Sequence, residues 1–179
     1  MHLLSVIIDE ISGVITKVDE QSLIKAAAEI TKDKRIFVIG EGRSGLMAKG
    51  FAMRLMHLGY EVYVVGETIT PAIKENDVVI AVSGSGKSTI VISETKKAKE
   101  KDSRLIVFTS NLASPLAKEA DVSVLVPGTV KGDQGENRKS IQLLSSLFDQ
   151  SVHIVLDGLC LFLSNRDGIS NEFATGKHW

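Results

Sequence analysis

The sequence predicts an α/β protein with a doubly wound parallel sheet, and three observations support this. Short β-branched runs with little polar alternation recur along the 179 residues, as in strands buried on both faces. Amphipathic segments with helical periodicity separate most of these runs. Small polar residues directly follow two of the runs, at the edge where doubly wound sheets bind ligands. We therefore expect five parallel strands flanked by helices, in a single domain that spans residues 1–179.

Five apolar runs are the expected strands. Right-handed crossovers between parallel strands give an open sheet that is covered on both faces. The segment 66–71 is expected to be a loop, and 127–139 a mobile surface loop because it is polar, glycine-rich and charged. The strands are expected at 35–39, 61–65, 78–82, 105–108 and 122–126.

Helical periodicity predicts the covering helices. Residues 3–18 form an amphipathic helix, and Asp19 or Ser22 caps a second helix that continues to about Thr31. We expect these N-terminal helices, within residues 1–32, to form part of an oligomer interface. The remaining helices are expected at 46–58, 88–101, 115–119 and 144–162, with little pattern after residue 165.

Composition and charge exclude several classes of function. Apolar residues make up 44% and charged residues 24%, as in ordinary globular domains. A net charge of −1 provides no basic field for nucleic acid or for an anionic membrane. Cys160 is expected to be a buried, inert thiol, and His153 a satisfied core group. Asp157 and His153 interrupt the last apolar region, which we expect to be too short to span a bilayer; without a signal-peptide pattern, the protein is expected to be cytoplasmic.

The stretch 77–89, DVVIAVSGSGKST, carries the strongest signal for a ligand. A strand that breaks into small residues and restarts as a helix presents free N–H groups and the positive end of a helix dipole, which favour an anion. Ser83, Ser85 and Ser88 add hydroxyl donors, and Gly84 lets the backbone approach a ligand. We predict that this turn holds a phosphate. A nucleoside-triphosphate loop is disfavoured because Ala81 stands where that motif needs glycine.

A second glycine-rich turn, at 40–45, follows the first expected strand. It matches the dinucleotide pattern G-x-G-x-x-G, and Glu67 could serve a ribose, so an NAD(P)-dependent enzyme is an alternative. Against this, the turn contains Arg43 and Ser44, and a dinucleotide site needs no second hydroxyl-rich turn. The Arg43 guanidinium either contacts a sugar phosphate or pairs with Glu41 or Glu67.

These motifs resemble the sugar isomerase (SIS) domain family. The resemblance rests on GRSGLMAKGFAMRLMHLG at 42–59, GETITP at 66–71 and SGSGKS at 83–88, and it extends over nearly the whole chain. The first block points to the 6-phospho-3-hexuloisomerase branch. The resemblance implies a five-stranded parallel sheet and an oligomer, commonly a tetramer, with sites between subunits. It also implies interconversion of D-arabino-hex-3-ulose 6-phosphate and D-fructose 6-phosphate, in the ribulose monophosphate route of formaldehyde fixation.

By position, the resemblance also assigns site residues. Asp149 falls where the family has a glutamate proposed as the base, although its side chain is one methylene shorter. Other departures are the sequence Leu-Leu-Ser at 143–145 in place of Pro-Met-Gly, and Lys87-Ser88 in place of Glu-Thr. The family has a C-terminal histidine, and His178 is the candidate counterpart. The implied substrate-binding residues are Gly42, Arg43, Ser44, Ser83, Gly84, Ser85 and Ser88.

The implied chemistry needs neither a hydride carrier nor a metal, so we expect no cofactor. Moving a carbonyl between adjacent carbons passes through an enediolate, and one carboxylate of raised pKa can shuttle the proton. Asp149 is the candidate, and its alternative role is that of a first-turn acid favouring a helix N-terminus. His57 is a second candidate, for proton transfer to substrate oxygens, unless it is a surface or interface imidazole. A non-catalytic sugar-phosphate sensor of the SIS type is a further alternative.

Overall fold

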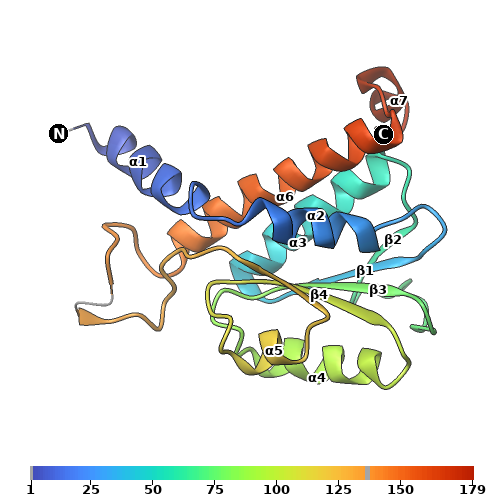
Figure 1. The fold of residues 1–179 in the computed structure, drawn as a ribbon, viewed down its shortest axis with the longest axis horizontal. Coiled ribbons are helices and arrows are strands. Elements are labelled where there is room, and N and C mark those ends of the chain that lie inside the picture. Colours follow the sequence, from blue (N-terminus) through green and yellow to red (C-terminus); the bar gives the residue numbers. More distant parts are fainter. Residues whose placement is uncertain (1, 136–137) are drawn as a thin grey trace.

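The computed structural model describes residues 2–135 and 138–179 and contains a five-stranded parallel sheet (Figure 1). The strands lie in the order β2-β1-β3-β4-β5, and every neighbouring pair is parallel. All five expected strands are confirmed, and their ends differ from expectation by a single residue at most. Their bounds are β1 Ile36–Gly40, β2 Val62–Val64, β3 Val78–Val82, β4 Arg104–Thr109 and β5 Val122–Leu125.

The order of the strands reverses at β1, which lies between β2 and β3. Gly40, the last residue of β1, is opposite Val82, the last residue of β3. Ligands of such sheets bind outside the carboxyl ends of the strands at this switch point. The turns after β1 and β3 therefore leave the sheet side by side.

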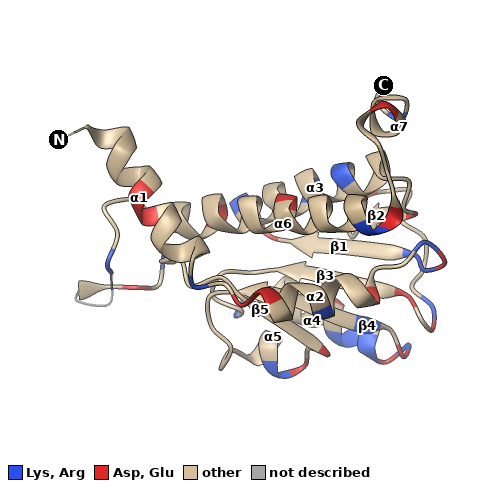
Figure 2. Cartoon of the chain, turned by 45° about the horizontal axis from the view of Figure 1, so that its top comes forward, with Lys and Arg blue, Asp and Glu red and all other residues tan. Residues whose placement is uncertain are grey.

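Helices cover both faces of the sheet, which confirms the doubly wound architecture. Alternate residues of β1 divide between two cores, with Ile36 and Val38 in one and Phe37 and Ile39 in the other. Charged residues lie mainly on helix surfaces and loops (Figure 2). The first core packs under α1 (Leu3–Ile15), α2 (Glu20–Glu29), α3 (Gly42–His57) and α6 (Ser146–Asp167), and the second under α4 (Thr89–Lys99) and α5 (Pro115–Lys118).

Several helix ends differ from expectation because caps and backbone angles decide them. Asp19, rather than Ser22, caps α2, and its carboxylate accepts from two backbone N–H groups. The last helix starts at Ser146, two residues later than expected, because Leu144 has a left-handed φ of 53°. It runs on to Asp167, where Gly168 ends it with a φ of 65°. The tail, which showed little pattern, forms the last turn of α6 and then α7 (Asn171–Thr175).

The helix α6 is a core helix of unusual length. Its 22 residues are long and apolar enough to cross a membrane by length and composition alone, so the expectation that this region is too short was wrong. It packs instead against α3, α1 and α2 and contributes ten buried residues. His153 was expected in the core, but it is exposed and lies 3.6 Å from the Asp157 carboxylate one turn later. The two polar residues thus mark the outer face of α6.

Two glycines allow α3 to start close to the sheet edge. A Cβ on Gly45 would lie 2.8 Å from the Gly40 carbonyl oxygen, and a Cβ on Gly40 would lie 2.9 Å from the Gly45 Cα. Both distances are shorter than real Cβ contacts. The outer glycines of the G-x-G-x-x-G pattern are therefore explained by helix–strand packing.

Candidate active site

The turns after β1 and β3 meet the start of α6 around a cavity of about 590 Å³, here called the switch-point pocket. All seven predicted substrate-binding residues line it, as does Asp149. The structure thus brings together residues that lie more than 100 positions apart in the sequence. The lining residues are Glu41, Gly42, Arg43, Ser44, Val82, Ser83, Gly84, Ser85, Lys87, Ser88, Val130, Lys131, Leu144, Ser145, Ser146 and Asp149.

The turn after β3 supplies hydroxyl donors and a helix N-terminus. Ser88 is the N-cap of α4, and its Oγ accepts from the Val91 N–H at 3.3 Å. The Ser85 Oγ accepts from the Lys87 N–H at 3.2 Å. Within the part of the chain that the structure describes, the hydroxyl protons of Ser83 and Ser85 are given to no protein acceptor. These two hydroxyls can therefore donate to a ligand.

The turn after β1 is tied to α6 by two side-chain hydrogen bonds. The Arg43 Nη1 donates to the Ser146 Oγ at 2.8 Å, and the Ser44 Oγ donates to the Asp149 Oδ1 at 2.6 Å. Arg43 thus contacts neither of the carboxylates weighed as its partners, Glu41 and Glu67. A hydroxyl has one proton, and Ser44 gives its proton to the Asp149 carboxylate. Ser44 can therefore donate to a ligand only if this hydrogen bond breaks.

Asp149 is a buried carboxyl at the wall of this pocket. It lies in the first turn of α6 and is 2% exposed. Burial raises its pKa, while the hydrogen bond from Ser44 and the charge of Arg43 oppose that rise. Such a carboxyl holds a proton more readily than an exposed aspartate, which suits a group that accepts and returns one.

Small residues from two loops seat the start of α6. A Cβ on Gly128 would lie 2.6 Å from the Phe148 Cα, and a Cβ on Gly84 would lie 2.9 Å from the Phe148 Cδ1. Phe148 is fully buried and precedes Asp149. The packing of Phe148 therefore fixes where the Asp149 carboxyl lies. Gly128 belongs to the expected mobile loop 127–139, of which residues 136 and 137 lie outside the described residues.

Five polar residues that line the pocket were not among the predicted site residues: Glu41, Lys87, Lys131, Ser145 and Ser146. The Glu41 Oε2 accepts from the Ser88 Oγ at 2.5 Å and so joins the two turns. Ser146 holds Arg43, and the Lys131 N–H donates to the Ser145 Oγ at 3.0 Å. The position of Glu41, directly after a strand and between glycines, was a usable signal. Nothing in the spacing of Lys131 and Ser146 indicated their place.

Two other reactive side chains lie away from the pocket. His57 ends α3 and does not line the pocket; it is 4% exposed and stacks on His178, with ring centroids 5.3 Å apart. Burial and the nearby Arg54 lower the pKa of His57, and its role stays a prediction. Cys160 is buried, and burial raises its pKa to about 12, so the expectation of an inert thiol is confirmed.

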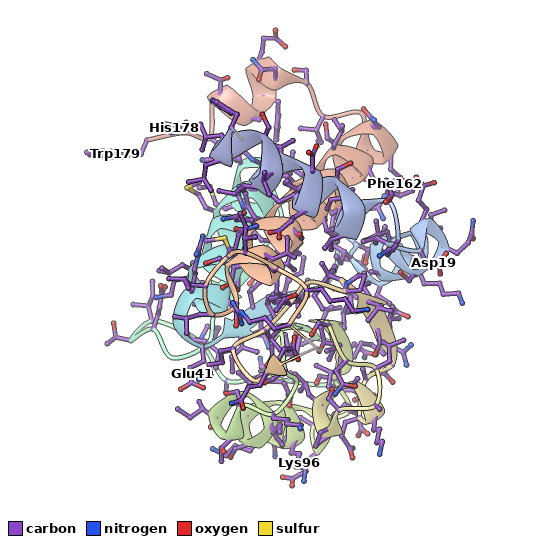
Figure 3. All side chains as sticks on the ribbon, turned by 90° about the vertical axis from the view of Figure 1, so that its left-hand side faces the viewer. Asp19, Glu41, Lys96, Phe162, His178 and Trp179 are labelled. Carbon is purple, nitrogen blue, oxygen red and sulfur yellow. The ribbon has the colours of Figure 1, made fainter. Side chains whose placement is uncertain are left out.

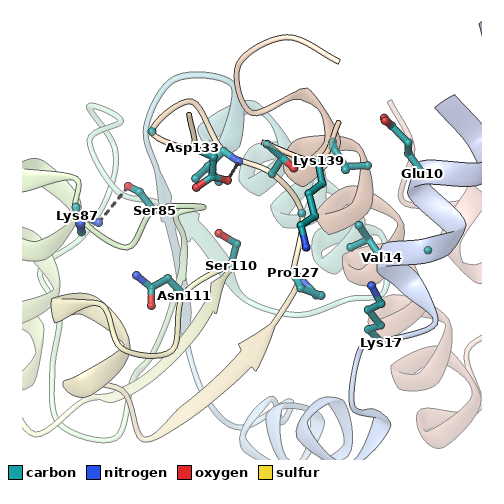
Figure 4. A pocket seen from close by; sticks show the side chains of 16 residues that line it. Glu10, Val14, Lys17, Ser85, Lys87, Ser110, Asn111, Pro127, Asp133 and Lys139 are labelled. Atoms are coloured by element: carbon teal, nitrogen blue, oxygen red, sulfur yellow. Dashed lines mark hydrogen bonds between the residues drawn. The ribbon is translucent and has the colours of Figure 1, made fainter. Parts of the chain in front are cut away.

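A second cavity adjoins the switch-point pocket at the serine turn (Figure 4). It has a volume of about 580 Å³ and shares Ser85, Lys87 and Val130 with the first. Lys17 and Lys139 line its far side. The serine turn thus borders both cavities.

The pocket suits a phosphorylated ligand and proton transfer. Hydroxyl donors, the start of α4 and the cations of Arg43, Lys87 and Lys131 favour an anion. The dinucleotide alternative is disfavoured, because the strand order differs from the 3-2-1-4-5-6 order of dinucleotide-binding domains and because Glu67 does not line the pocket. Among the described residues, no three His, Cys, Asp or Glu side chains gather as a metal site. Fold and pocket together define a doubly wound α/β protein whose pocket combines donors that suit an anion with an adjacent buried carboxyl.

Comparison with known proteins gives the family. The SIS domain model matches residues 29–154, so the chain belongs to the SIS domain family. A relative from Bacillus subtilis, named 3-hexulose-6-phosphate isomerase, is 37% identical over 96% of this chain and 93% of its own length. A relative of the same name from Mycobacterium gastri is 38% identical over 98% of this chain and 87% of its own.

A solved structure shares the whole fold. It is a hypothetical protein from Methanococcus jannaschii, 29% identical, with a TM-score of 0.85 over 100% of this chain and 98% of its own. Its structure was described as inferring a molecular function of 3-hexulose-6-phosphate isomerase.

Proposed function

We propose that this chain is a 6-phospho-3-hexuloisomerase, which interconverts D-arabino-hex-3-ulose 6-phosphate and D-fructose 6-phosphate. The names of the relatives from Bacillus subtilis and Mycobacterium gastri support an isomerase. The observation that carries the proposal is the buried Asp149 carboxyl beside a phosphate-type serine turn. We place the reaction in the ribulose monophosphate route of formaldehyde fixation and the protein in the cytoplasm.

In this proposal the phosphate of the sugar binds at the serine turn. Ser83 and Ser85 donate their hydroxyl protons, and the start of α4 adds backbone N–H groups. Arg43, Lys87 and Lys131 balance the phosphate charge. These contacts hold carbons 2 and 3 of the sugar near α6.

Asp149 then moves one proton. Its carboxylate takes a proton from the carbon next to the carbonyl, an enediolate forms, and the proton is delivered to the former carbonyl carbon. The hydroxyl proton passes from the oxygen that becomes the new carbonyl to the oxygen that becomes the new hydroxyl. Ser44 orients the carboxylate through its 2.6 Å hydrogen bond. Donors near the developing oxyanion lower the barrier, and Arg43 is the cation best placed beside Asp149.

Solvent exchange tests this reaction directly. The protein is incubated with fructose 6-phosphate in deuterium oxide, and label in the carbon-bound positions is followed by NMR. We expect incorporation of deuterium together with signals of the 3-ketose. The variant Asp149→Asn is the matched control and should give neither. Binding of fructose 6-phosphate by the wild type with neither label uptake nor formation of the 3-ketose would refute the enzyme and leave the SIS-type sensor, which binds the sugar phosphate without converting it.

A further inference from the structure

Glu41 is a charged residue of the pocket that neither the motifs nor the expected chemistry uses. It stands at the N-cap position of α3, yet its side chain makes no capping hydrogen bond there. Its carboxylate reaches instead to the N-cap of the other helix and accepts from the Ser88 Oγ at 2.5 Å. Figure 3 shows Glu41 as an outlying side chain rather than part of the core.

This contact uses the proton that Ser88 would give to a phosphate. A serine hydroxyl has one proton and two lone pairs. The Ser88 Oγ gives its proton to Glu41 and accepts from the Val91 N–H, which completes the α4 cap. While Glu41 is in place, Ser88 therefore cannot donate to a ligand.

The Glu41 carboxylate also occupies an electrostatically favourable place for an anion. It lies where both α3 and α4 begin, so the positive ends of two helix dipoles act on it. Arg43 and Lys87 line the same pocket, and neither forms an ion pair with another described residue. A phosphate entering this pocket meets the same donors and the same cations.

We propose that Glu41 is a built-in competitor for the phosphate subsite, which the substrate phosphate displaces from Ser88. This inference rests on the proposed function, because it concerns the same pocket. The Glu41 carboxylate and a phosphate cannot both accept the single Ser88 proton, and the two negative groups repel each other. Because a phosphate must displace Glu41 before it binds Ser88, Glu41 lowers the affinity for phosphate-bearing ligands. Glu41 also speeds the release of these ligands, because it returns to Ser88.

Equilibrium binding of inorganic phosphate, followed by isothermal titration calorimetry, tests this without turnover. The Glu41→Ala variant should bind phosphate about five- to tenfold more tightly than the wild type, because it lacks one charged competitor for a hydrogen bond. Glu41→Gln, which keeps the shape and removes the charge, should also bind more tightly. Glu67→Ala is the matched control, because Glu67 is exposed and outside the pocket, and it should leave the affinity unchanged.

The outcomes separate this inference from the proposed function. Equal or weaker binding by Glu41→Ala, or an equal gain in Glu67→Ala, would overturn the role of Glu41 while leaving the phosphate site in place. A gain that persists undiminished in a Ser88→Ala background would also overturn it, since the competition is for the Ser88 proton. If neither the wild type nor any of the variants binds phosphate or fructose 6-phosphate, the proposed function fails together with the inference. Thermal unfolding of each variant confirms that it is folded.

Discussion

The hydrogen bond between Ser44 and Asp149 is the residue-scale contact on which the proposed chemistry depends. It holds the Oδ1 of a carboxylate that lines the pocket, at 2.6 Å. The carboxyl is one methylene shorter than that of a glutamate, so its reach depends on where Phe148 seats the helix. The family resemblance indicated both residues by position, but no spacing rule joins positions 44 and 149. Only the packed fold brings them together.

Replacing Asp149 by asparagine should abolish most of the turnover. A positioned general base contributes about 10²- to 10⁴-fold to a rate, so kcat should fall by that factor. The dissociation constant for fructose 6-phosphate should change little, because the phosphate binds at the serine turn. Steady-state kinetics and calorimetry measure the two quantities. Asp149→Glu, which restores a carboxylate, should retain more activity than Asp149→Asn; full activity in Asp149→Asn would remove Asp149 from the mechanism.

The raised pKa of Asp149 also predicts an effect on stability. A carboxyl whose pKa is higher in the folded than in the unfolded state binds more protons when folded, so its contribution to stability falls as the pH rises between the two values. At pH 7 the charged carboxylate therefore destabilises the fold, and Asp149→Asn should raise the melting temperature. The gain should shrink below about pH 4, where the unfolded carboxyl is protonated as well. If Asp149→Asn lowers the melting temperature at pH 7, and if the difference from the wild type is the same at every pH, this prediction is contradicted.

At the scale of elements, the apolar runs predicted strands well because strands buried on both faces need no alternation. Helix ends were predicted less well. The helix α3 ends at His57, one residue before the expected end, whereas the left-handed Leu144 delayed the start of α6. A leucine gives no sequence signal for a positive φ, so this end could be found only from the structure.

The approach of α3 to β1 gives a prediction at this scale. Gly45→Ala would place a Cβ 2.8 Å from the Gly40 carbonyl oxygen, so the helix or strand must shift. We expect a loss of about 1–3 kcal/mol in the free energy of unfolding, measured by urea denaturation. Gly50→Ala is the matched control on the same helix, where a Cβ has no atom within 4 Å. It should be neutral or stabilising by up to about 1 kcal/mol. Equal effects of the two substitutions would contradict the packing explanation.

At the scale of the whole molecule, several large apolar side chains on the outer faces of α3 and α6 remain exposed. Leu161 is 63% exposed, Met53 is 51% exposed and Phe162 is 42% exposed. Figure 3 labels Phe162. The N-terminal helix α1 extends away from the sheet and exposes Leu3, Leu4 and Ile8 as well (Figure 1). We propose that these surfaces join copies of the chain into a homo-oligomer, a tetramer as the family resemblance implies.

Analytical ultracentrifugation tests the assembly. The wild type should sediment as an oligomer, and Leu161→Glu should shift it to smaller species at the same concentration, because an apolar interface pays a large desolvation cost for a carboxylate. Lys96→Glu, a charge change on the exposed surface of α4, is the control and should leave the assembly intact. A monomeric wild type, or equal sedimentation of both variants, would contradict the interface.

The central claim is that the turns after β1 and β3 together hold the phosphate of a sugar beside Asp149. A crystal structure of the protein with fructose 6-phosphate measures this directly. The account predicts the phosphorus within hydrogen-bonding reach of Ser83 and Ser85, carbons 2 and 3 next to the Asp149 carboxylate, and Glu41 released from Ser88. A phosphate bound away from both turns would contradict it.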